Sequence, residues 1–380
     1  MMETMVETAV MEEEMNNCFG EALSGLLQNS VTLAANTLSL SLRRNAGGLT
    51  HVLEVPRILP DGSVVDRIES ANTFPRATAI EALLDARDIG IDIPQPFLAE
   101  ECNRLTAAKR KDVRGGWSYF DGVPELPPDI DDLGTVARTL ARAPGPERAA
   151  CYADAMEYCL NSFHSDGSRS TWVMDTDSPG YSRMQRYMEL IPKFEGRHPE
   201  VIANFLAAAY VCYPDHSYDD VLRSGAAWLL ARQQKDGSWK SNFYGSPCYS
   251  TMMVLTTLKA LDQDGPQLEA GCHFSETLQE EDGSWLQGDA LATACAITGL
   301  AVAVTGLAVT GRMGDAVRRG LRFLLLSQEP DGLWPPGIFV RVKTPLGFHQ
   351  QRSREITGAF CIKAMAASLL GGRLRWLRYE

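Results

Sequence analysis

Hydrophobic residues recur at three- and four-residue steps along the second half of the chain, which is the pattern of amphipathic helices. These stretches come in pairs. The first member of each pair mixes charged and apolar residues and occupies 217–233, 267–280 and 315–328. The second member is more apolar and richer in alanine and other small residues, and it occupies 246–261, 289–304 and 357–370. Helices that are apolar all round are buried, so we predict an inner layer of second members inside an outer layer of first members.

The turn between the helices of each pair carries the motif QxxDGxW, whose three copies end at Trp239, Trp285 and Trp334, at spacings of 46 and 49 residues. The Asp-Gly step is typical of a turn that ends a helix, because glycine adopts the left-handed conformation without a steric penalty. The tryptophan buries a large ring and needs a partner for its N–H group. We interpret the motif as a structural lock between hairpins and place none of its tryptophans in a site.

Weaker copies of the repeat precede these three. An Asp-Gly turn at 166–167 is followed by Trp172, and a Gly-Gly-Trp turn ends at Trp117. The chain then offers about eleven or twelve helices in five or six hairpins of about 50 residues, which bury their faces only against neighbouring hairpins. We predict an all-α fold, a single (α/α)6 toroid with an irregular N-terminal extension.

Three segments divide the chain in this prediction. Residues 1–20 are acidic and expected to be flexible, residues 21–74 are expected to form an arm that packs on the barrel, and residues 75–380 are expected to form the barrel. Within the arm, the sequence HVLEVPRIL at 51–59 predicts a strand or an extended arm. Residues 1 to about 70 are therefore expected to lie outside the ring.

The amino-acid composition limits the number of domains, the binding partners and the disulfides that can be expected. The 380 residues are 45% hydrophobic, enough for one large domain or two modest ones. Acidic residues outnumber basic ones by 48 to 36 and the formal net charge is −12, so a nucleic-acid partner is not expected. The nine cysteines form no CxxC pair and lie mostly in apolar stretches, as reduced thiols of a cytoplasmic protein do. We expect no disulfides, and a monomer or a weak homodimer.

No stable membrane anchor is expected. The N-terminus is negatively charged where a secretory signal is positively charged, and no apolar core follows it. The longest apolar stretch, 291–309, is long enough to raise the question of a membrane span. Its threonine and glycine content and its lack of flanking aromatic anchors favour a helix buried inside an all-α protein. We therefore expect a cytoplasmic protein with at most transient membrane association.

The most unusual local chemistry is a cluster of three carboxylates, Asp129, Asp131 and Asp132, directly before a predicted inner helix. Pro127 and Pro128 fix an extended approach, which places the aspartates at the N-cap and in the first turn. Capping the helix is the simplest role for such residues. Three carboxylates exceed what a cap needs, and like charges held close together raise the pKa of one of them. A carboxyl group that stays protonated in an apolar hollow is a Brønsted acid suited to an alkene.

Two motifs together resemble a known family. The QxxDGxW repeats resemble the QW motifs of the squalene-hopene and oxidosqualene cyclases, and the sequence of residues 129–132 resembles the DxDD motif of class II terpene cyclases. The resemblance covers about residues 75–375 and is nearest to single-domain cyclases of the merosterolic acid synthase type, because the chain is long enough for one barrel only. It implies a class II terpene or meroterpenoid cyclase, an isomerase that cyclises a linear polyprenyl or prenylated aromatic substrate through carbocations.

The resemblance also implies roles for individual residues. Asp131, the middle aspartate of DxDD, is the general acid, and Asp129 and Asp132 orient it and tune its acidity. No cofactor is needed, and Mg²⁺ would help only if the substrate were a diphosphate. Carbocations need shielding by aromatic π faces. Among the aromatic residues of the barrel, we expect those next to turns at the DxDD end to line the pocket, namely Phe120, Trp172, Tyr244 and Phe339.

The segment 174–197 is a longer connection than the other repeats have, and it could close the site. Its basic residues could bind the polar head of a substrate or lie in a solvated loop. A second set of basic residues, near the C-terminus, could likewise bind the polar head or lie in solvent. The two groups are Arg183, Arg186 and Lys193, and Arg341, His349, Arg352 and Arg354. Prenyl length, head group, ring number and the residue that quenches the final cation are not fixed by the sequence.

Two other enzyme classes share the α/α barrel. Zinc-dependent prenyltransferases and lanthipeptide cyclases bind metal through Cys, His or Asp, but Cys248 and His349 have no matched partners, so no metal site is expected. A glycoside hydrolase on an α/α toroid would use paired carboxylates. The candidates for its second acid are Asp175, Asp177, Asp289 and Asp315. A lipid-binding barrel without catalytic activity is a third alternative.

Overall fold

Six inner helices form a closed ring in the computed structural model, which describes residues 2–44, 51–59, 61–143, 145–190, 196–304, 311–344 and 347–373. Each inner helix packs on the next, and the last packs back on the first. They are α2 (Thr73–Asp88), α4 (Ile130–Arg142), α7 (Pro199–Cys212), α9 (Pro247–Ala260), α11 (Ala290–Val304) and α13 (Arg354–Leu369). Their buried faces are rich in alanine, which lets the helices approach closely around the core.

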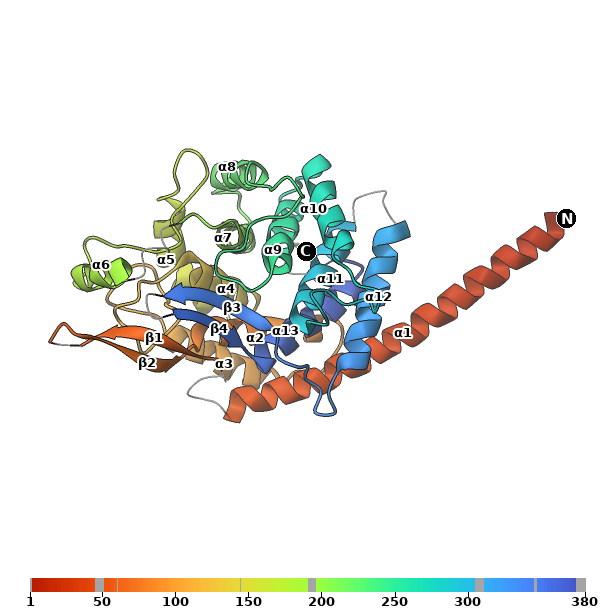
Figure 1. The fold of residues 1–380 in the computed structure, drawn as a ribbon, viewed down its shortest axis with the longest axis horizontal. Coiled ribbons are helices and arrows are strands. Elements are labelled where there is room, and N and C mark those ends of the chain that lie inside the picture. The colour runs from red at the N-terminus through yellow and green to blue at the C-terminus, as the bar shows by residue number, and fades with distance from the viewer. Residues whose placement is uncertain are drawn as a thin grey trace.

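Six outer helices surround this ring in the described residues. Each outer helix precedes its inner partner in the chain, and Figure 1 shows the helices placed around the body of the molecule. The outer helices are α1 (Met2–Arg44), α3 (Gln95–Ala107), α5 (Ala149–Leu160), α8 (Asp219–Leu230), α10 (Pro266–Thr277) and α12 (Gly311–Ser327). The predicted all-α (α/α)6 toroid is confirmed. Two short helices lie outside the pattern, η1 (Pro146–Arg148) and α6 (Tyr181–Leu190).

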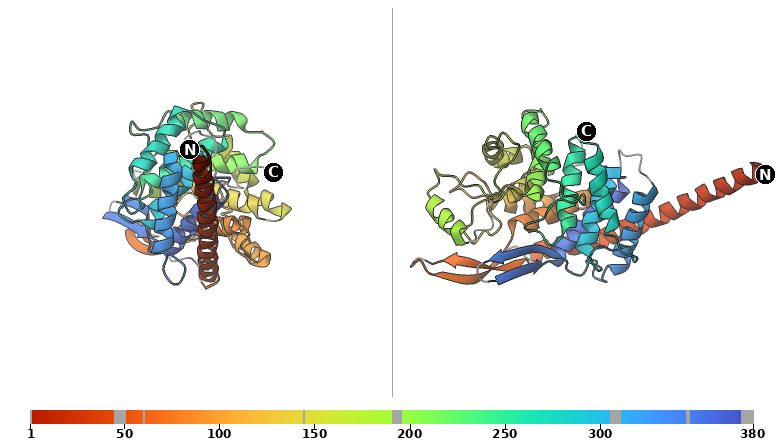
Figure 2. Two further views of the ribbon diagram at one scale, coloured as in Figure 1. Left: turned by 90° about the vertical axis from the view of Figure 1, so that its right-hand side faces the viewer. Right: turned by 45° about the horizontal axis from the view of Figure 1, so that its top comes forward.

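Helix α1 completes the outer layer of the barrel. This differs from the expectation that the first 70 residues lie outside the ring. It packs on α13, α2 and α12, and buries Leu27, Val31, Leu38 and Leu42. Its other end projects away from the body as a regular helix that includes residues 2–20, the segment expected to be flexible (Figures 1 and 2). The sequence pattern did not reveal that α1 belongs to the barrel. No QxxDGxW turn follows α1, and a β-hairpin joins it to α2. The division of the chain into domains stays a prediction.

The three QxxDGxW turns make the same contacts, so their interpretation as structural locks is confirmed. Each tryptophan is fully buried and donates its indole N–H to the backbone carbonyl ten residues earlier, at 2.7, 2.6 and 2.8 Å for Trp239, Trp285 and Trp334. Each glutamine side chain donates to a carbonyl of the next outer helix, at 2.7, 2.8 and 3.1 Å. The last of these carbonyls belongs to Ser30 in α1. Helix α1 therefore stands where the outer helix of the following repeat would be.

The turn at Asp166 and Gly167 departs from the interpretation of Trp172 as the tryptophan of its repeat. Arg169 occupies that position, because its Nε donates to the carbonyl of Cys159, ten residues earlier, at 3.2 Å. The guanidinium thus replaces the indole in holding the turn to the preceding helix. Trp172 is three residues further along and lines a cavity.

Two antiparallel hairpins lie side by side across one end of the ring (Figure 2). The first joins β1 (Val52–Ile58) to β2 (Val64–Ser70), which confirms the strand predicted at 51–59. The second joins β3 (Ile338–Thr344) to β4 (Gly347–Arg352). Gln351 links them by donating its side-chain N–H to the carbonyl of Val52. The hairpins supply part of the wall of the cavity described below.

The apolar stretch 291–309 is an inner helix, α11, over its described part. No helix in the described part of the chain has the length and apolar character that crossing a membrane requires. Eight of the nine cysteines, those from Cys102 onward, are free thiols, and six of these eight are buried.

Candidate active site

The carboxylate cluster lies at the N-terminus of α4, where the chain enters the inner layer. Asp129 is the N-cap, and its Oδ1 accepts a hydrogen bond from the backbone N–H of Asp132 at 2.7 Å. The capping role considered for this cluster is therefore filled by one aspartate. The preceding strand-like segment is fixed by backbone hydrogen bonds from Ile130 to Thr171 at 3.0 Å and from Val173 to Pro128 at 2.8 Å. Asp131 and Asp132 begin the first turn without serving as the cap.

Asp131 is held by two donors from other inner elements. The Asn204 side chain of α7 donates to its Oδ1 at 2.6 Å, and the Tyr244 hydroxyl donates to its Oδ2. Burial raises the pKa of Asp131 to about 6, and the hydrogen bonds from Tyr244 and Asn204 limit that rise because they favour the charged form. Asp131 is therefore a fixed carboxyl group that can carry a proton near neutral pH.

The two flanking aspartates are more strongly biased toward the protonated form. Burial, and then the charge of Asp131, raise the pKa of Asp129 to about 8. Burial and the charges of Asp129 and Asp131 raise the pKa of Asp132 well above its usual range. The carboxyl oxygens of Asp132 are buried and have no hydrogen-bond partner among the described residues. The cluster thus holds protons that isolated aspartates would lose.

An apolar cavity of about 100 Å³ opens beside Asp129 and Asp131. Its wall combines the hairpin strand β1, the turns before α4, α7 and α9, and a residue of α6. The lining residues are Leu53, Glu54, Val55, Pro56, Tyr119, Phe120, Leu126, Asp129, Asp131, Thr171, Trp172, Tyr187, Val201, Phe243, Tyr244 and Val340. The buried carboxyl groups of Asp129 and Asp131 and the exposed Glu54 therefore face a pocket whose other walls are mainly aliphatic and aromatic.

The structure brings three of the four expected pocket aromatics to this cavity. Phe120, Trp172 and Tyr244 line it, and Tyr244 also contacts the acid. Phe339 is not among the lining residues and packs behind Tyr244, with ring centroids 4.9 Å apart. Its backbone carbonyl accepts the N–H of Gly245 at 2.8 Å, which ties β3 to the segment that carries Tyr244. A role for these four residues in binding substrate stays a prediction.

A family model for the C-terminal domain of squalene-hopene cyclases matches residues 105–367, more than half of the chain. The chain belongs to this family. The QxxDGxW turns and the carboxylate cluster both lie within the matched residues.

Curated relatives of this squalene-hopene cyclase family member are distant and longer. The squalene-hopene cyclase of Zymomonas mobilis subsp. mobilis is 25% identical over 260 residues, which are 60% of this chain and 37% of the relative. An ent-copalyl diphosphate synthase of a Streptomyces species is 26% identical over 284 residues, covering 72% of this chain and 47% of the relative. The chain spans less than half the length of these relatives.

Solved structures share the fold of the whole chain. The type II terpene cyclase MstE from Scytonema, as a variant in complex with geranylgeranyl dihydroxybenzoate, superposes with a TM-score of 0.68 at 17% identity and covers 92% of this chain and 99% of that one. A possible member of the GH105 family from Salmonella enterica has a TM-score of 0.57 at 13% identity, covering 90% and 94% of the two chains. Single-barrel proteins of different chemistry thus share this toroid.

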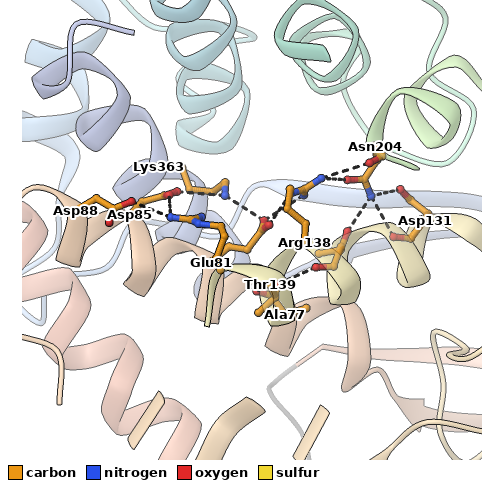
Figure 3. A network of polar contacts seen from close by, with 11 residues as sticks. Ala77, Glu81, Asp85, Asp88, Asp131, Arg138, Thr139, Asn204 and Lys363 are labelled. Atoms are coloured by element: carbon orange, nitrogen blue, oxygen red, sulfur yellow. Dashed lines mark hydrogen bonds and ion pairs between the residues drawn. The ribbon is translucent and has the colours of Figure 1, made fainter. Parts of the chain in front are cut away.

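A buried chain of polar contacts extends from the acid through the core of this cyclase family member (Figure 3). Asn204, which donates to Asp131, accepts from Arg138 at 2.6 Å, and Arg138 in turn pairs with Glu81 at 2.6 Å. Lys363 bridges Glu81 and Asp85, at 3.1 and 3.2 Å. The contacts join α2, α4, α7 and α13, so they connect the acid to the packing of the ring.

The sequence prediction missed these network residues, although it contained a signal for them. Glu81, Arg138 and Lys363 are charged residues among the buried residues of inner helices. A buried charge needs a partner, so such residues on neighbouring helices are expected to pair. Their partners are up to 282 residues away, which local spacing does not reveal.

The long connection at 174–197 contributes Tyr187 of α6 to the cavity wall. Arg186 donates to the carbonyl of Gly62 at 3.0 Å and thereby links α6 to the first hairpin. Arg354 pairs with Glu329 and Asp331 and so is used within a repeat turn. Lys193 and the side chain of His349 lie outside the described residues.

The residues weighed for the other enzyme classes lie elsewhere. In the described ranges, no three His, Cys, Asp or Glu side chains form a group that could hold a metal ion, and Cys248 is a buried free thiol. The buried Asp175 and the exposed Asp177 both pair with Arg114, at 3.5 and 2.7 Å. Asp289 bonds to the first turn of α11, and Asp315 pairs with Arg318 in α12. None of these four aspartates lines the cavity beside Asp131.

Proposed function

We propose that this chain is a class II terpene cyclase, an isomerase that starts cyclisation by protonating an alkene or epoxide. The observation that carries the proposal is Asp131, a buried carboxyl with a raised pKa that faces an apolar cavity and is fixed by Asn204 and Tyr244. A general acid works best when its pKa lies near the working pH and its proton is already positioned. Asp129 and Asp132 flank Asp131 in the same buried cluster, where the pKa of each is also raised, and we propose that they orient it.

The cavity suits the steps that follow protonation. The proton leaves the Asp131 carboxyl and bonds to one carbon of the terminal alkene, which leaves a tertiary carbocation on the other carbon. Successive internal alkenes attack this centre and close the rings. Trp172, Phe120 and Tyr244 present aromatic faces that stabilise positive charge, and the apolar walls keep water from capturing it.

The substrate we propose is a linear polyprenyl chain or a prenylated aromatic compound. MstE, which shares the single-barrel fold, was solved with geranylgeranyl dihydroxybenzoate. The cavity of about 100 Å³ is lined mainly by aliphatic and aromatic side chains, which suit a polyprenyl chain. Proton transfer from a carboxyl needs no cofactor, and Mg²⁺ would assist only in binding a diphosphate head.

A substrate panel tests the proposal. The purified protein is incubated with farnesyl and geranylgeranyl diphosphate and with farnesylated and geranylgeranylated benzoates, and products are identified by mass spectrometry. We expect cyclic isomers of unchanged mass, and one deuterium per product molecule when the solvent is D₂O. Asp131→Asn is expected to lower turnover by about 10²- to 10⁴-fold or more, the usual contribution of a general acid.

Asp220→Asn is the matched control, because this aspartate is exposed at the surface of α8 and makes only a surface ion pair. It is expected to cyclise at the wild-type rate. Product formation by Asp131→Asn at the normal rate would contradict the proposal. Activity that depends on added zinc, or hydrolysis of a glycoside, would favour the other barrel enzymes, and ligand binding unchanged by Asp131→Asn without turnover would favour a lipid-binding barrel.

A further inference from the structure

A tyrosine and a histidine form a second hydrogen-bonded pair at the cavity, separate from the contacts of the acid. Tyr119 lines the same cavity as Asp131. Its hydroxyl is hydrogen-bonded to Nε2 of His51, and the two rings meet edge to face with centroids 5.6 Å apart. His51 is fully buried at the start of the first hairpin, with the Phe339 ring on its other side at 6.0 Å.

His51 is placed to remain neutral until it receives a proton. Burial lowers the pKa of its imidazole to about 3, because charge is costly without solvent. Its Nδ1 has no hydrogen-bond partner among the described residues. A neutral imidazole has one lone pair, and when Nδ1 carries the proton this lone pair lies on Nε2, where the Tyr119 hydroxyl donates.

We propose that Tyr119 and His51 act as the base that ends the cyclisation, which rests on the proposed class II function and assigns its last step. The final carbocation loses a proton from a carbon next to its cationic centre, and the electrons of that C–H bond form the new alkene. The proton bonds to the phenol oxygen of Tyr119 while the phenol's own proton moves to Nε2 of His51. The products are a neutral alkene, a neutral phenol and an imidazolium.

The charges balance across the cavity at the end of this sequence. Asp131 has become a carboxylate by giving up its proton, and His51 has become a cation. Asp131 lines the cavity and His51 lies directly behind Tyr119, another residue of its wall, so the two opposite charges form close to the same cavity. Returning the proton from His51 to Asp131 through solvent, after the product leaves, restores the starting state.

One other hydroxyl and imidazole pair faces the cavity, formed by Thr171 and His198 at 2.9 Å. The Thr171 hydroxyl also lies 3.3 Å from the carbonyl of Gly196, which can take its proton. His198 then needs only to donate to Thr171, so its lone pair is not turned toward the cavity. The other two hydroxyls of the wall belong to Tyr187 and Tyr244; Tyr244 already donates to Asp131, and Tyr187 is not one of the two residues paired with an imidazole. Tyr119 is therefore the hydroxyl with a base directly behind it.

Product ratios test this assignment, because they report the last step separately from the first. Tyr119→Phe keeps the ring and removes the proton-transfer oxygen, and His51→Gln keeps an acceptor while removing the basic nitrogen. Both variants are expected to consume substrate, while the share of the wild-type alkene falls by roughly tenfold or more, since a positioned base contributes about 10²- to 10⁴-fold. Other double-bond isomers, and alcohols heavier by one water, replace it.

Tyr152→Phe is the matched control, since it removes a buried phenol from outer helix α5, away from the cavity. It is expected to give the wild-type ratio. If both Tyr119→Phe and His51→Gln give the wild-type product ratio, the assignment of the base is wrong while the proposed function stands. The same holds if Thr171→Val changes the product ratio and Tyr119→Phe does not. No consumption of substrate by the wild type contradicts the proposed function and the pair together.

Discussion

The pKa of Asp131, the proposed general acid, is set by opposing effects. Burial raises the pKa, whereas the hydrogen bonds from Tyr244 and Asn204 lower it. The same two hydrogen bonds fix the direction of the carboxyl group. Positioning of the proton and the tendency to hold it are thus controlled by the same contacts, and a change in either donor alters both.

Tyr244→Phe tests the effect of one hydrogen bond on the pKa of Asp131, because it removes one donor and keeps the ring. The acid works in its protonated form, so kcat/KM is expected to fall as the pH rises through about 6 in the wild type. Without the Tyr244 hydroxyl the pKa of Asp131 rises, so the falling limb moves to higher pH. A hydrogen bond to a charged group contributes about 1.5–3 kcal/mol and one pH unit corresponds to about 1.36 kcal/mol, so the shift is roughly 1 to 2 pH units.

The pH dependence of kcat/KM for a neutral prenylated ester is the appropriate measurement, because the substrate itself does not titrate. Tyr152→Phe again serves as the control and should keep the wild-type limb. A limb that stays in place, or moves to lower pH, in Tyr244→Phe would show that Asp131 is not the titrating acid.

The sequence was sufficient to locate the carboxylate cluster but not the residues that contact it. Asp129, Asp131 and Asp132 are adjacent in the chain, so one motif contains them. Asn204, Tyr244 and His51 approach the cavity from three other segments, and only the closure of the ring brings them together. Phe339 follows a turn at the correct end of the barrel, yet it is one layer behind the cavity wall.

At the scale of single elements, the Asp-Gly turns determine how closely one hairpin approaches the next. Gly167 has a φ of 80°, and a Cβ added there would lie 2.0 Å from the carbonyl oxygen of Ser224 in α8. Glycine is therefore required here for two reasons, its backbone conformation and the close approach of the neighbouring helix. The same two conditions apply at Gly237, where the added Cβ would lie 2.2 Å from the carbonyl of Ala270.

Gly167→Ala and Gly90→Ala distinguish these two reasons. Gly90 has a similar φ of 91°, but an added Cβ would meet nothing within 4 Å. Gly90→Ala is expected to lower the free energy of unfolding by about 1–2 kcal/mol, the cost of the left-handed conformation. Gly167→Ala should lower it by clearly more, because α8 must also move. Urea unfolding monitored by circular dichroism measures both, and equal losses would show that the contact with α8 contributes nothing.

The repeat was predictable because its turns use the same residues at the same spacing, and each residue makes a local contact. Arg169 was harder to recognise, since a guanidinium replaces an indole in that turn. The turn that lacks the repeat tryptophan is also the one followed by the long connection and by Trp172 at the cavity. The repeat is thus least regular where it forms the site.

At the scale of the whole molecule, helix α1 contributes to the barrel as much as any repeat. Its four large buried residues, Leu27, Val31, Leu38 and Leu42, stabilise the fold by roughly 6–12 kcal/mol at about 1.5–3 kcal/mol each. A domain has a net stability of about 5–15 kcal/mol. The ring is therefore expected to depend on a segment that carries no copy of the motif.

Two truncations test this dependence. Removal of residues 1–20 takes away only the projecting part of α1 and is expected to leave the thermal midpoint of unfolding unchanged. Removal of residues 1–44 exposes the faces of α13 and α2 and is expected to give an aggregated or unfolded protein. Calorimetry and size-exclusion chromatography measure the outcome. A folded, active protein lacking residues 1–44 would show that the ring is complete without α1.

Closure by α1 also sets an order for folding during synthesis. The helix packs on α12 and α13, which are synthesised after all the other helices of the barrel. The chain grows at about 5–20 residues per second, so the 325 residues between the ends of α1 and α13 take roughly 16–65 s to appear. During that interval the apolar face of α1 has no partner for most of its length. The protein is thus expected to need protection of its N-terminal helix until its C-terminus is made.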